Sequence, residues 1–203
     1  MEVKQITRET AQSLICDIHY AKRMPRIKYV FGLFEGADLV GIVSFGSPSS
    51  PQVARSVYAG LRSVVLELNR LVITTSARNA ASFLIGRALR LIPPPWVVVS
   101  YADMGRGHKG YVYQATNFKY AGLSKPHDAE YIIDGKRVHP RTLTARGIKN
   151  PVEWAKQNGI TRVSIEPKHR YVMWKGVADK DILWKFMSYP KGDSQRYLAP
   201  NYR

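Results

Sequence analysis

The chain has 203 residues, of which 45% are hydrophobic and 23% are charged, as in an ordinary folded domain and unlike a disordered chain. Lys and Arg number 31 against 15 Asp and Glu, so the net charge of +16 indicates a polyanionic partner, nucleic acid before a membrane surface. The one cysteine, Cys16, excludes an intrachain disulfide and a cysteine-based zinc cage. Because no apolar run reaches transmembrane length, we expect a protein of the cytoplasm.

The first half of the chain predicts helices alternating with strands. We expect a helix over residues 7–20, a hairpin of strands at 29–34 and 39–45, and a strand at 64–73. Strict alternation along the third strand puts Glu67 and Asn69 on one face and Arg70 on the other. Glu67 and Asn69 either bind a substrate or form a buried structural network.

A strong helix is predicted at residues 80–91, with Asn79 as its side-chain cap. Its apolar stripe consists of Ala81, Leu84, Ala88 and Leu91. A strand at 96–100 follows, so the helix reads as a crossover between two parallel strands.

Local turn signals dominate the second half. Asp134-Gly135 predicts a hairpin over residues 131–138, and Asn150-Pro151 predicts the start of a short helix. Late strands are expected at 163–165 and 170–174. We interpret the chain as one α/β (α+β) domain, with a central mixed sheet flanked by helices. Its core covers about residues 1–124, and a basic C-terminal elaboration covers about 125–203.

The densest group of polar residues follows the strand at 96–100, where α/β proteins usually form their sites. Tyr101 and Asn117 are candidates for substrate binding. His108 lies between glycines, either as a general acid/base or as a residue that holds its loop. If residues 110–117 are helical, Tyr111 and Tyr113 point in different directions, and we expect Tyr113 to face the site.

Basic residues near the two ends are candidates for contacts to a DNA backbone, although simple solvation accounts for most surface lysines. The candidates are Lys22, Arg23, Arg26, Lys28, Lys168 and Arg170.

Several motifs resemble the Mom family of bacteriophage DNA-modification proteins, on a fold similar to GNAT acyltransferases. The motifs are His19-Tyr20, residues 22–25, Tyr29 with residues 32–34, residues 67–71, residues 79–86, residues 100–118, residues 168–172 and residues 189–192. The resemblance covers nearly the whole chain, and residues 100–118 are its specific part. It implies conversion of adenine in double-stranded DNA to N6-carbamoylmethyladenine, which protects phage DNA from restriction.

The resemblance also implies a catalytic centre of His19, Tyr20, Asp103 and Tyr113, with Arg70 and Ser82 as further functional residues. It implies dependence on iron, for which His19, Asp103 and Tyr113 have suitable ligand types. The alternative is that His19 and Asp103 cap neighbouring helices. Alkylation of adenine in a duplex also requires the base to be flipped out of the stack.

One segment departs from the usual GNAT pattern. The run from Arg78 through Phe83 lacks the glycines that let a backbone approach the coenzyme A pyrophosphate. Use of acetyl-CoA is therefore open. Two other functions stay open with it: a conventional acetyl-CoA N-acyltransferase acting on a small amine or protein, and a non-catalytic basic DNA-binding module. A homodimer is also left open.

Overall fold

The computed structural model describes residues 1–125 and 127–192. It divides into two compact units, which we call the first unit and the second unit. Among the described residues, the first unit contains 1–101, 110–122 and 170–192, and the second contains 102–109, 123–125 and 127–169. The elaboration expected from about residue 125 therefore returns to the first unit at Arg170.

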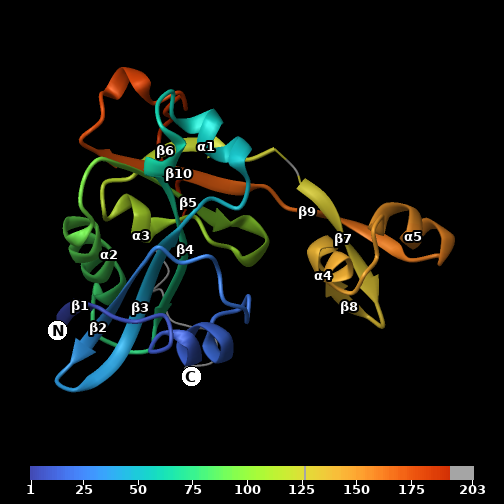
Figure 1. The fold of residues 1–203 in the computed structure, drawn as a ribbon, viewed down its shortest axis with the longest axis horizontal. Coiled ribbons are helices and arrows are strands. Elements are labelled where there is room, and N and C mark those ends of the chain that lie inside the picture. The colour runs from blue at the N-terminus through green and yellow to red at the C-terminus, as the bar shows by residue number, and fades with distance from the viewer. Residues whose placement is uncertain (126, 193–203) are drawn as a thin grey trace. The chain divides into compact units, whose positions relative to one another are not determined.

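A mixed seven-stranded sheet organises the structure (Figure 1). Its strands are β1 (Glu2–Gln5), β2 (Tyr29–Glu35), β3 (Asp38–Gly46), β4 (Val65–Ile73), β5 (Trp96–Asp103), β6 (Lys119–Leu123) and β10 (Lys168–Lys175). They lie in the order β1-β2-β3-β4-β5-β10-β6. Strands β1 to β4 pair antiparallel, and β4 pairs with β5 in parallel. The predicted mixed α/β class, hairpin and parallel crossover are confirmed.

The helices of the first unit are short except for the crossover helix. They are η1 (Leu14–Ile18), α1 (Pro51–Val57), η2 (Arg62–Val64), α2 (Ala80–Leu91), α3 (Tyr111–Gln114) and η4 (Asp179–Asp181). The helix expected over residues 7–20 is only the π-helical turn η1, preceded by turns in which Thr7 Oγ1 accepts a hydrogen bond from the Thr10 amide. Strand β1 and helix α1 were not predicted.

Helix α2 has the predicted bounds, but two details of the prediction are wrong. Asn79 occupies the N-cap with φ 62°, and its side chain makes no capping hydrogen bond. In this left-handed conformation its carbonyl instead accepts from Phe83 N and Ser82 Oγ. Leu91 is 52% exposed because the helix ends at this residue, beyond the packed stripe.

A β-bulge at Asn69 overturns the predicted faces of β4. Ser44 of β3 pairs with Arg70, but the next residue, Phe45, pairs with Leu68, so Asn69 is the extra residue. The bulge shifts the alternation by one position and brings Arg70 close enough to Glu67 for their charges to interact. Sequence alternation cannot reveal such an insertion.

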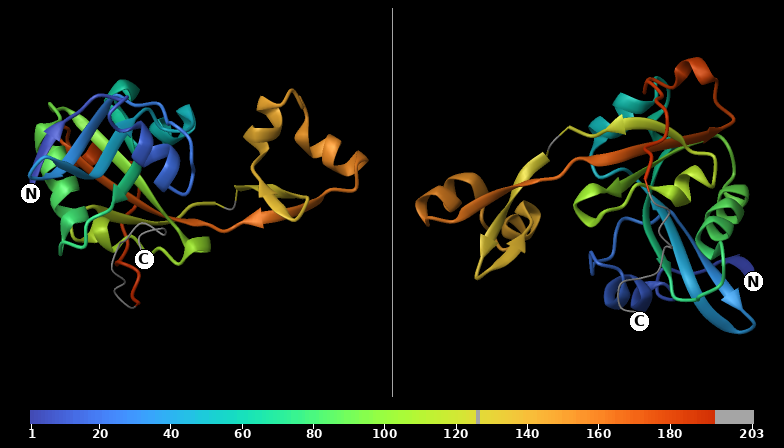
Figure 2. Two further views of the ribbon diagram at one scale, coloured as in Figure 1. Left: turned by 90° about the horizontal axis from the view of Figure 1, so that it is seen from below. Right: turned by 180° about the vertical axis from the view of Figure 1, so that it is seen from behind.

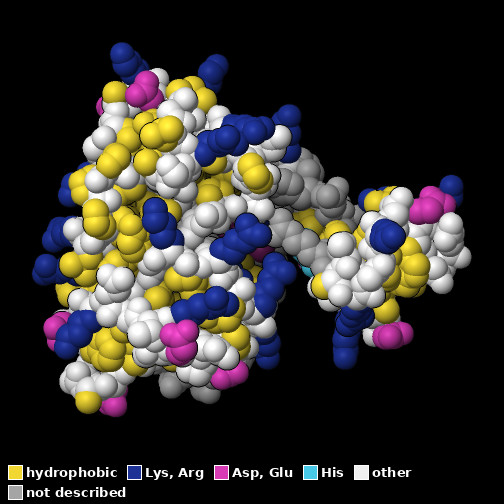
Figure 3. Space-filling view, viewed as in Figure 1, with side chains coloured by type: hydrophobic (Ala, Val, Ile, Leu, Met, Phe, Trp, Pro, Cys, Tyr) yellow, Lys and Arg dark blue, Asp and Glu magenta, His cyan; other side chains and the backbone are white. Residues whose placement is uncertain are grey.

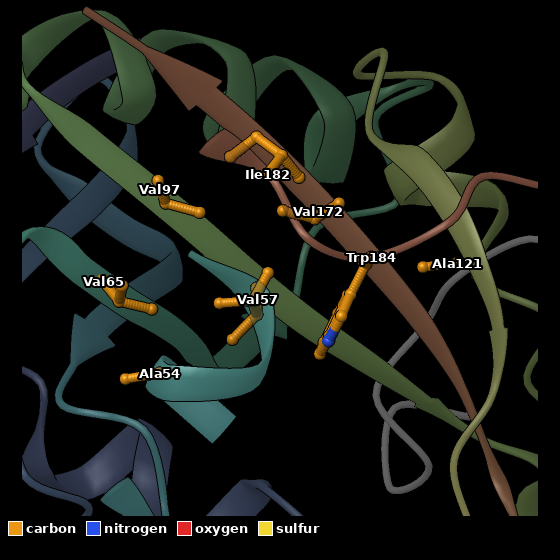
Figure 4. Close-up of a cluster of buried hydrophobic side chains, with 9 residues drawn as sticks. Ala54, Val57, Val65, Val97, Ala121, Val172, Ile182 and Trp184 are labelled. Atoms are coloured by element: carbon orange, nitrogen blue, oxygen red, sulfur yellow. The ribbon is translucent and has the colours of Figure 1, made fainter. Parts of the chain in front are cut away.

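One core cluster of the first unit joins β4, β5, β10 and β6 to helix α1 (Figure 4). Val57 of α1 lies among Val65, Val97 and Val172, and Trp184 covers the same cluster from the later chain. Val57, Val97 and Val172 are fully buried, and burial of each stabilises the fold by about 1.5–3 kcal/mol. This packing holds the central strands in place behind the polar ends of β4 and β5.

The second unit has its own sheet and core. Its sheet, in the order β8-β7-β9, contains β7 (His127–Ile133), β8 (Lys136–Val138) and β9 (Thr161–Ile165). Its helices are η3 (Met104–Arg106), α4 (Pro140–Ala145) and α5 (Pro151–Gln157), and Figure 2 shows α4 and α5 from two further sides. Tyr131, Leu143 and Ala155 form the buried core.

The turn signals predicted in the second unit are confirmed. Asp134 and Gly135 both have positive φ, as a type I′ hairpin requires. Asn150 Oδ1 caps α5 by accepting from the Glu153 amide, and Gly159 follows the helix with φ 64°. Within residues 1–125 and 127–192, no helix combines the length and apolar character needed to cross a membrane.

Candidate active site

The parallel strands β4 and β5 pair over only three positions, from Val65–Val97 to Glu67–Val99. Beyond Glu67 the two strands no longer form a ladder, although both continue. The Ser100 hydroxyl of β5 donates to the Leu68 carbonyl of β4 at 3.4 Å, as a side-chain bridge where the ladder stops. The polar side chains at this end of β4 and β5 therefore surround a break in the strand pairing.

Glu67 is the carboxylate at this break. Its Oε2 accepts a hydrogen bond from the Ser49 amide at 2.9 Å, which holds the loop before α1 against β4. Its charge also acts on Arg70, Tyr101 and Tyr113, because each of their pKa values responds to it. Glu67 thus links residues from β4, β5 and α3.

Tyr113 approaches the same break from α3. Its side chain is buried, its hydroxyl is hydrogen-bonded to Ser100, and its ring packs on Phe118 and Tyr171 with centroids 5.6 and 5.2 Å away. Burial raises the pKa of Tyr113 to about 12, despite the Ser100 hydrogen bond, which lowers it. The phenol is therefore protonated at neutral pH.

Gly110 leaves the space that the Tyr113 ring needs for this position. It has φ 77°, and a Cβ there would lie 3.0 Å from the Tyr113 ring and closer still to the Tyr171 ring. Only glycine combines this backbone conformation with this close approach. The prediction that Tyr113 faces the site rests on this short helix, and Tyr20 and Glu67 add smaller contributions that raise the pKa of Tyr113 after burial.

Tyr101 and Arg170 lie on the neighbouring strands β5 and β10. Burial first, and Glu67 second, raise the pKa of Tyr101, while Arg170 lowers it. The Arg170 guanidinium donates to the Ala121 carbonyl at 2.6 Å and lies 4.9 Å from the Trp184 ring centroid. Arg170 is thus engaged in packing within the first unit, and its predicted contact with DNA stays a prediction.

The bulge residues Asn69 and Arg70 bind backbone. Asn69 Nδ2 donates to the Arg26 carbonyl at 3.0 Å, and Arg70 Nη2 donates to the Arg23 carbonyl at 3.1 Å. Desolvation is the main reason why the pKa of Arg70 is lowered. Its Nε is buried and has no hydrogen-bond partner among the described residues, so it can donate to an acceptor on a ligand.

His19 and Tyr20 follow η1 and stack on each other, with ring centroids 4.4 Å apart. His19 is 8% exposed, and its Nδ1 accepts a hydrogen bond from the Ala21 amide at 3.1 Å. Tyr20 is 43% exposed and acts electrostatically on both Arg70 and Tyr113. Tyr20 is therefore the accessible aromatic side of the cluster that Glu67, Arg70 and Tyr113 form in the first unit.

Asp103 and His108 belong to the second unit. Asp103 Oδ1 caps η3 by accepting from the Gly105 amide at 3.1 Å, and its Oδ2 lies 3.6 Å from Lys168 Nζ. The His108 amide donates to the Asp103 carbonyl at 3.0 Å, and His108 is exposed. The alternative in which Asp103 caps a helix is thus present in the structure, and its catalytic role stays a prediction.

A groove of about 580 Å³ lies beside α2 within the first unit. It contains two predicted substrate-binding residues, Ser82 and Asn117. The other lining residues include the cations Arg87, Arg90 and Lys175 and the aromatic rings of Phe83, Trp96 and Trp174, with no carboxylate. Sequence reasoning did not assign these cations to a site, although the i, i+3 spacing of the two arginines on α2 was a usable signal. The groove suits an anionic ligand.

The described side chains do not present a ready set of iron ligands. Within residues 1–125 and 127–192, no three His, Cys, Asp or Glu side chains gather as a metal would require. His19 Nδ1 and both Asp103 oxygens already have protein partners. The described residues therefore do not support the expected iron site.

Comparison with known proteins identifies the family of this chain. The model of the Mom protein family matches residues 1–191. The chain belongs to the Mom protein family. It is 33% identical over 152 residues to the methylcarbamoylase mom of Escherichia phage Mu. The match covers 71% of this chain and 62% of the phage Mu protein, so the chain spans less than two thirds of that relative's length.

The solved structures that this Mom family chain matches include two acetyltransferases. Arabidopsis thaliana NAA60 in complex with acetyl-CoA is 12% identical, with a TM-score of 0.49 over 85% of this chain and 97% of that one. A Bacillus subtilis acetyltransferase in complex with CoA is 10% identical, with a TM-score of 0.46 over 86% and 97%. The family expected from the sequence is confirmed by the family model and the phage Mu relative.

Proposed function

We propose that this Mom family protein is a transferase that attaches a carbamoylmethyl group to N6 of adenine in double-stranded DNA. The observation that carries the proposal is the family match over residues 1–191, with a relative named methylcarbamoylase. The net charge of +16 supports a nucleic acid substrate. The same modification would protect phage DNA from restriction in the cytoplasm of the host.

The cluster at the break between β4 and β5 offers the chemistry that this reaction needs. A flipped adenine requires an aromatic surface and polar partners for its edge. Tyr20 supplies an exposed ring, and the buried Nε of Arg70 supplies a donor. The Tyr113 hydroxyl donates to Ser100, because the Ser100 proton goes to the Leu68 carbonyl, so the Tyr113 oxygen supplies an acceptor for the base edge.

The transfer can be written with these residues. A bond forms between adenine N6 and the methylene carbon of an electrophilic carbamoylmethyl donor. The bond from that carbon to its leaving group breaks, and the leaving group keeps the electron pair. N6 loses one proton, which Glu67, as the carboxylate of the cluster, accepts.

The groove beside α2 is our candidate for the donor site. Arg87, Arg90 and Lys175 favour a donor that carries negative charge, such as a phosphate-bearing carrier. The same observation favours a second function, in which the protein is a conventional acetyl-CoA N-acyltransferase. Binding of coenzyme A by itself fits both functions, whereas acetylation of an amine without change to DNA fits only the second.

Mass spectrometry of nucleosides tests the proposal. DNA from bacteria that express the wild type should contain adenosine heavier by one carbamoylmethyl group. We expect Tyr113→Phe, His19→Ala and Asp103→Asn to lose most of this product. Tyr58→Phe is the matched control, because it makes the same Tyr-to-Phe change at a residue that packs on the hydrophobic core cluster and has no proposed role in the reaction, so it should keep wild-type levels.

The outcomes separate the candidate functions. A different adduct mass would keep a DNA-modifying enzyme and change the donor. Unmodified DNA with folded wild-type protein would contradict the proposal. Acetyl transfer to an amine would then support the acyltransferase, and DNA binding alone would support a non-catalytic module.

A further inference from the structure

The loop between η1 and β2 exposes four cations. Lys22, Arg23, Arg26 and Lys28 are all exposed, and no Asp or Glu lies between Tyr20 and Tyr29. We call residues 22–28 the basic loop. Its apolar residues point the other way, since Met24 and Ile27 pack against the buried cluster that contains Ala11 and Ile15. The basic loop is thus anchored to the core through its apolar residues.

The bulged strand β4 fixes the backbone of the basic loop. Arg70 Nη2 holds the Arg23 carbonyl at 3.1 Å, and Asn69 Nδ2 holds the Arg26 carbonyl at 3.0 Å. The Ser44 hydroxyl orients Asn69 by donating to its Oδ1 at 2.7 Å. Each carbonyl is therefore held by a side chain that the bulge places beneath it.

Strand β3 adds two further constraints. The Lys28 amide donates to the Phe45 carbonyl at 2.7 Å. A Cβ on Gly46 would collide with the Arg26 carbonyl, so the loop backbone lies directly on the strand. Lys22 has φ 40°, a strained conformation for a lysine that costs about 1–3 kcal/mol. The fold tolerates this strain at one end of the basic loop.

The four cations of the basic loop pair with no carboxylate in the part of the chain that the structure describes. Lys28 Nζ lies 5.5 Å from the centroid of the Tyr29 ring. This contact attracts the ammonium group but brings no negative charge to it. Figure 3 shows Lys and Arg side chains over the part of the first unit where this loop runs. A rigid backbone that presents four unpaired cations suits a polyanion.

We propose that the basic loop grips the phosphate backbone of double-stranded DNA beside the candidate active site, and that Asn69 and Arg70 are positioning residues for this loop. The choice of duplex DNA as the polyanion rests on the proposed function. The loop begins directly after Tyr20, so its phosphate contacts would lie next to the ring that faces a flipped base. Fixing the loop in advance lowers the entropy cost of binding.

The test is the salt dependence of binding to a fluorescent 20-base-pair duplex, measured by anisotropy. The variant replaces Lys22, Arg23, Arg26 and Lys28 by Gln, and these exposed positions should tolerate the change. If each cation meets one phosphate, the slope of log K against log salt becomes shallower by about 3–4. Affinity should fall at least about tenfold at low salt.

The matched control replaces four exposed cations of the second unit, Lys136, Lys149, Lys156 and Arg162, by Gln. It removes the same charge and should change the slope by less than about 1. An equal change of slope in both variants would overturn the proposal, because binding would then follow net charge. Lost binding to phosphatidylglycerol vesicles, with unchanged duplex binding, would also overturn it.

A double-mutant cycle tests the positioning role. Asn69→Ala keeps every charge but releases the Arg26 carbonyl, and should weaken duplex binding several-fold. In the variant with four Gln residues, Asn69→Ala should have no further effect, because its effect passes through the loop. Equal effects in both backgrounds would contradict the positioning role.

Failure of this inference can be told apart from failure of the proposed function. Suppose that the four-Gln variant keeps the wild-type slope of log K against log salt while wild-type protein modifies adenine. The basic loop then does not bind the phosphate backbone, and the proposed function is unaffected. If the slope becomes shallower as expected but wild-type protein leaves DNA unmodified, the basic loop does bind DNA and the proposed catalytic function is wrong.

Discussion

The two units solve different structural problems. In the second unit, local signals set the hairpin at Asp134-Gly135 and the start of α5 at the Asn150 cap. In the first unit, the site depends on distant segments, since Asn69 of β4 holds Arg26, 43 residues earlier in the chain. Local turn chemistry thus accounts for two elements of the second unit, whereas the candidate site in the first unit depends on a bulge and a break in strand pairing.

The comparison implies that the two cores can be destabilised separately. Leu84→Ala in α2 and Leu143→Ala in α4 each remove a buried side chain and should cost about 2–5 kcal/mol. Hydrogen exchange should show that Leu143→Ala lowers protection in the second unit while β2 to β4 stay protected. Loss of protection throughout the chain would mean that the two units unfold as one.

Alanine substitutions at two glycines with similar φ distinguish the cost of backbone strain from the cost of steric crowding. Gly110 of the first unit and Gly107 of the second have φ 77° and 71°. Gly107→Ala should cost about 1–2 kcal/mol for the left-handed conformation alone, since no atom lies within 4 Å of its Cβ position. Gly110→Ala should cost more, because it also meets the Tyr113 and Tyr171 rings. Urea unfolding measures both, and equal costs would contradict the crowding.

Alkaline pH should destabilise the first unit through Tyr113. Its pKa is raised to about 12 in the folded protein against about 10 when unfolded, so the unfolded chain ionises first. The resulting stability is fully present below pH 10 and is lost between pH 10 and 12, by about 2–3 kcal/mol. Tyr113→Phe should flatten this part of a stability–pH curve, and an unchanged curve would contradict the assignment.

Asp103 provides the smallest stability effect and a sharp test of its role. Asn is as good a cap as Asp, so Asp103→Asn should keep η3 and lose only the pairing with Lys168, at less than about 1 kcal/mol. Thermal unfolding measures this cost. A loss of DNA modification in this stable variant would show a chemical role for Asp103, whereas full activity would show that it only caps.

The sequence predicted elements whose signals are local. The stripe of α2, the hairpin from β2 to β3 and the cap of α5 all have their causes within a few residues. The first helix was overextended, since only η1 forms a regular helix, and α1 was missed because its heptapeptide has little pattern. Asn79 was correctly predicted as the N-cap of α2, but the capping hydrogen bond expected from its side chain is not formed.

The candidate site was only partly predictable. Tyr113 was expected from the resemblance and from a helix over residues 110–117, and Glu67 from strand alternation that left a structural role open. Their common position beside the break depends on where β4 and β5 stop pairing. Arg70 was assigned to the opposite face because alternation assumes a regular strand. The sequence left Arg87 and Arg90 of α2 as a solvated or phosphate-contacting helix face, and only the fold places Lys175 of β10 in the same groove.

The sequence by itself determined the family and most elements, because motifs and turn chemistry lie in neighbouring residues. The polyanionic partner that its net charge indicates stays a prediction. Only the tertiary structure decided which polar side chains meet. One extra residue in β4 turns Arg70 toward Glu67 and places Asn69 under the basic loop. The physical reason is that a bulge depends on pairing with a second strand, so no single segment encodes it.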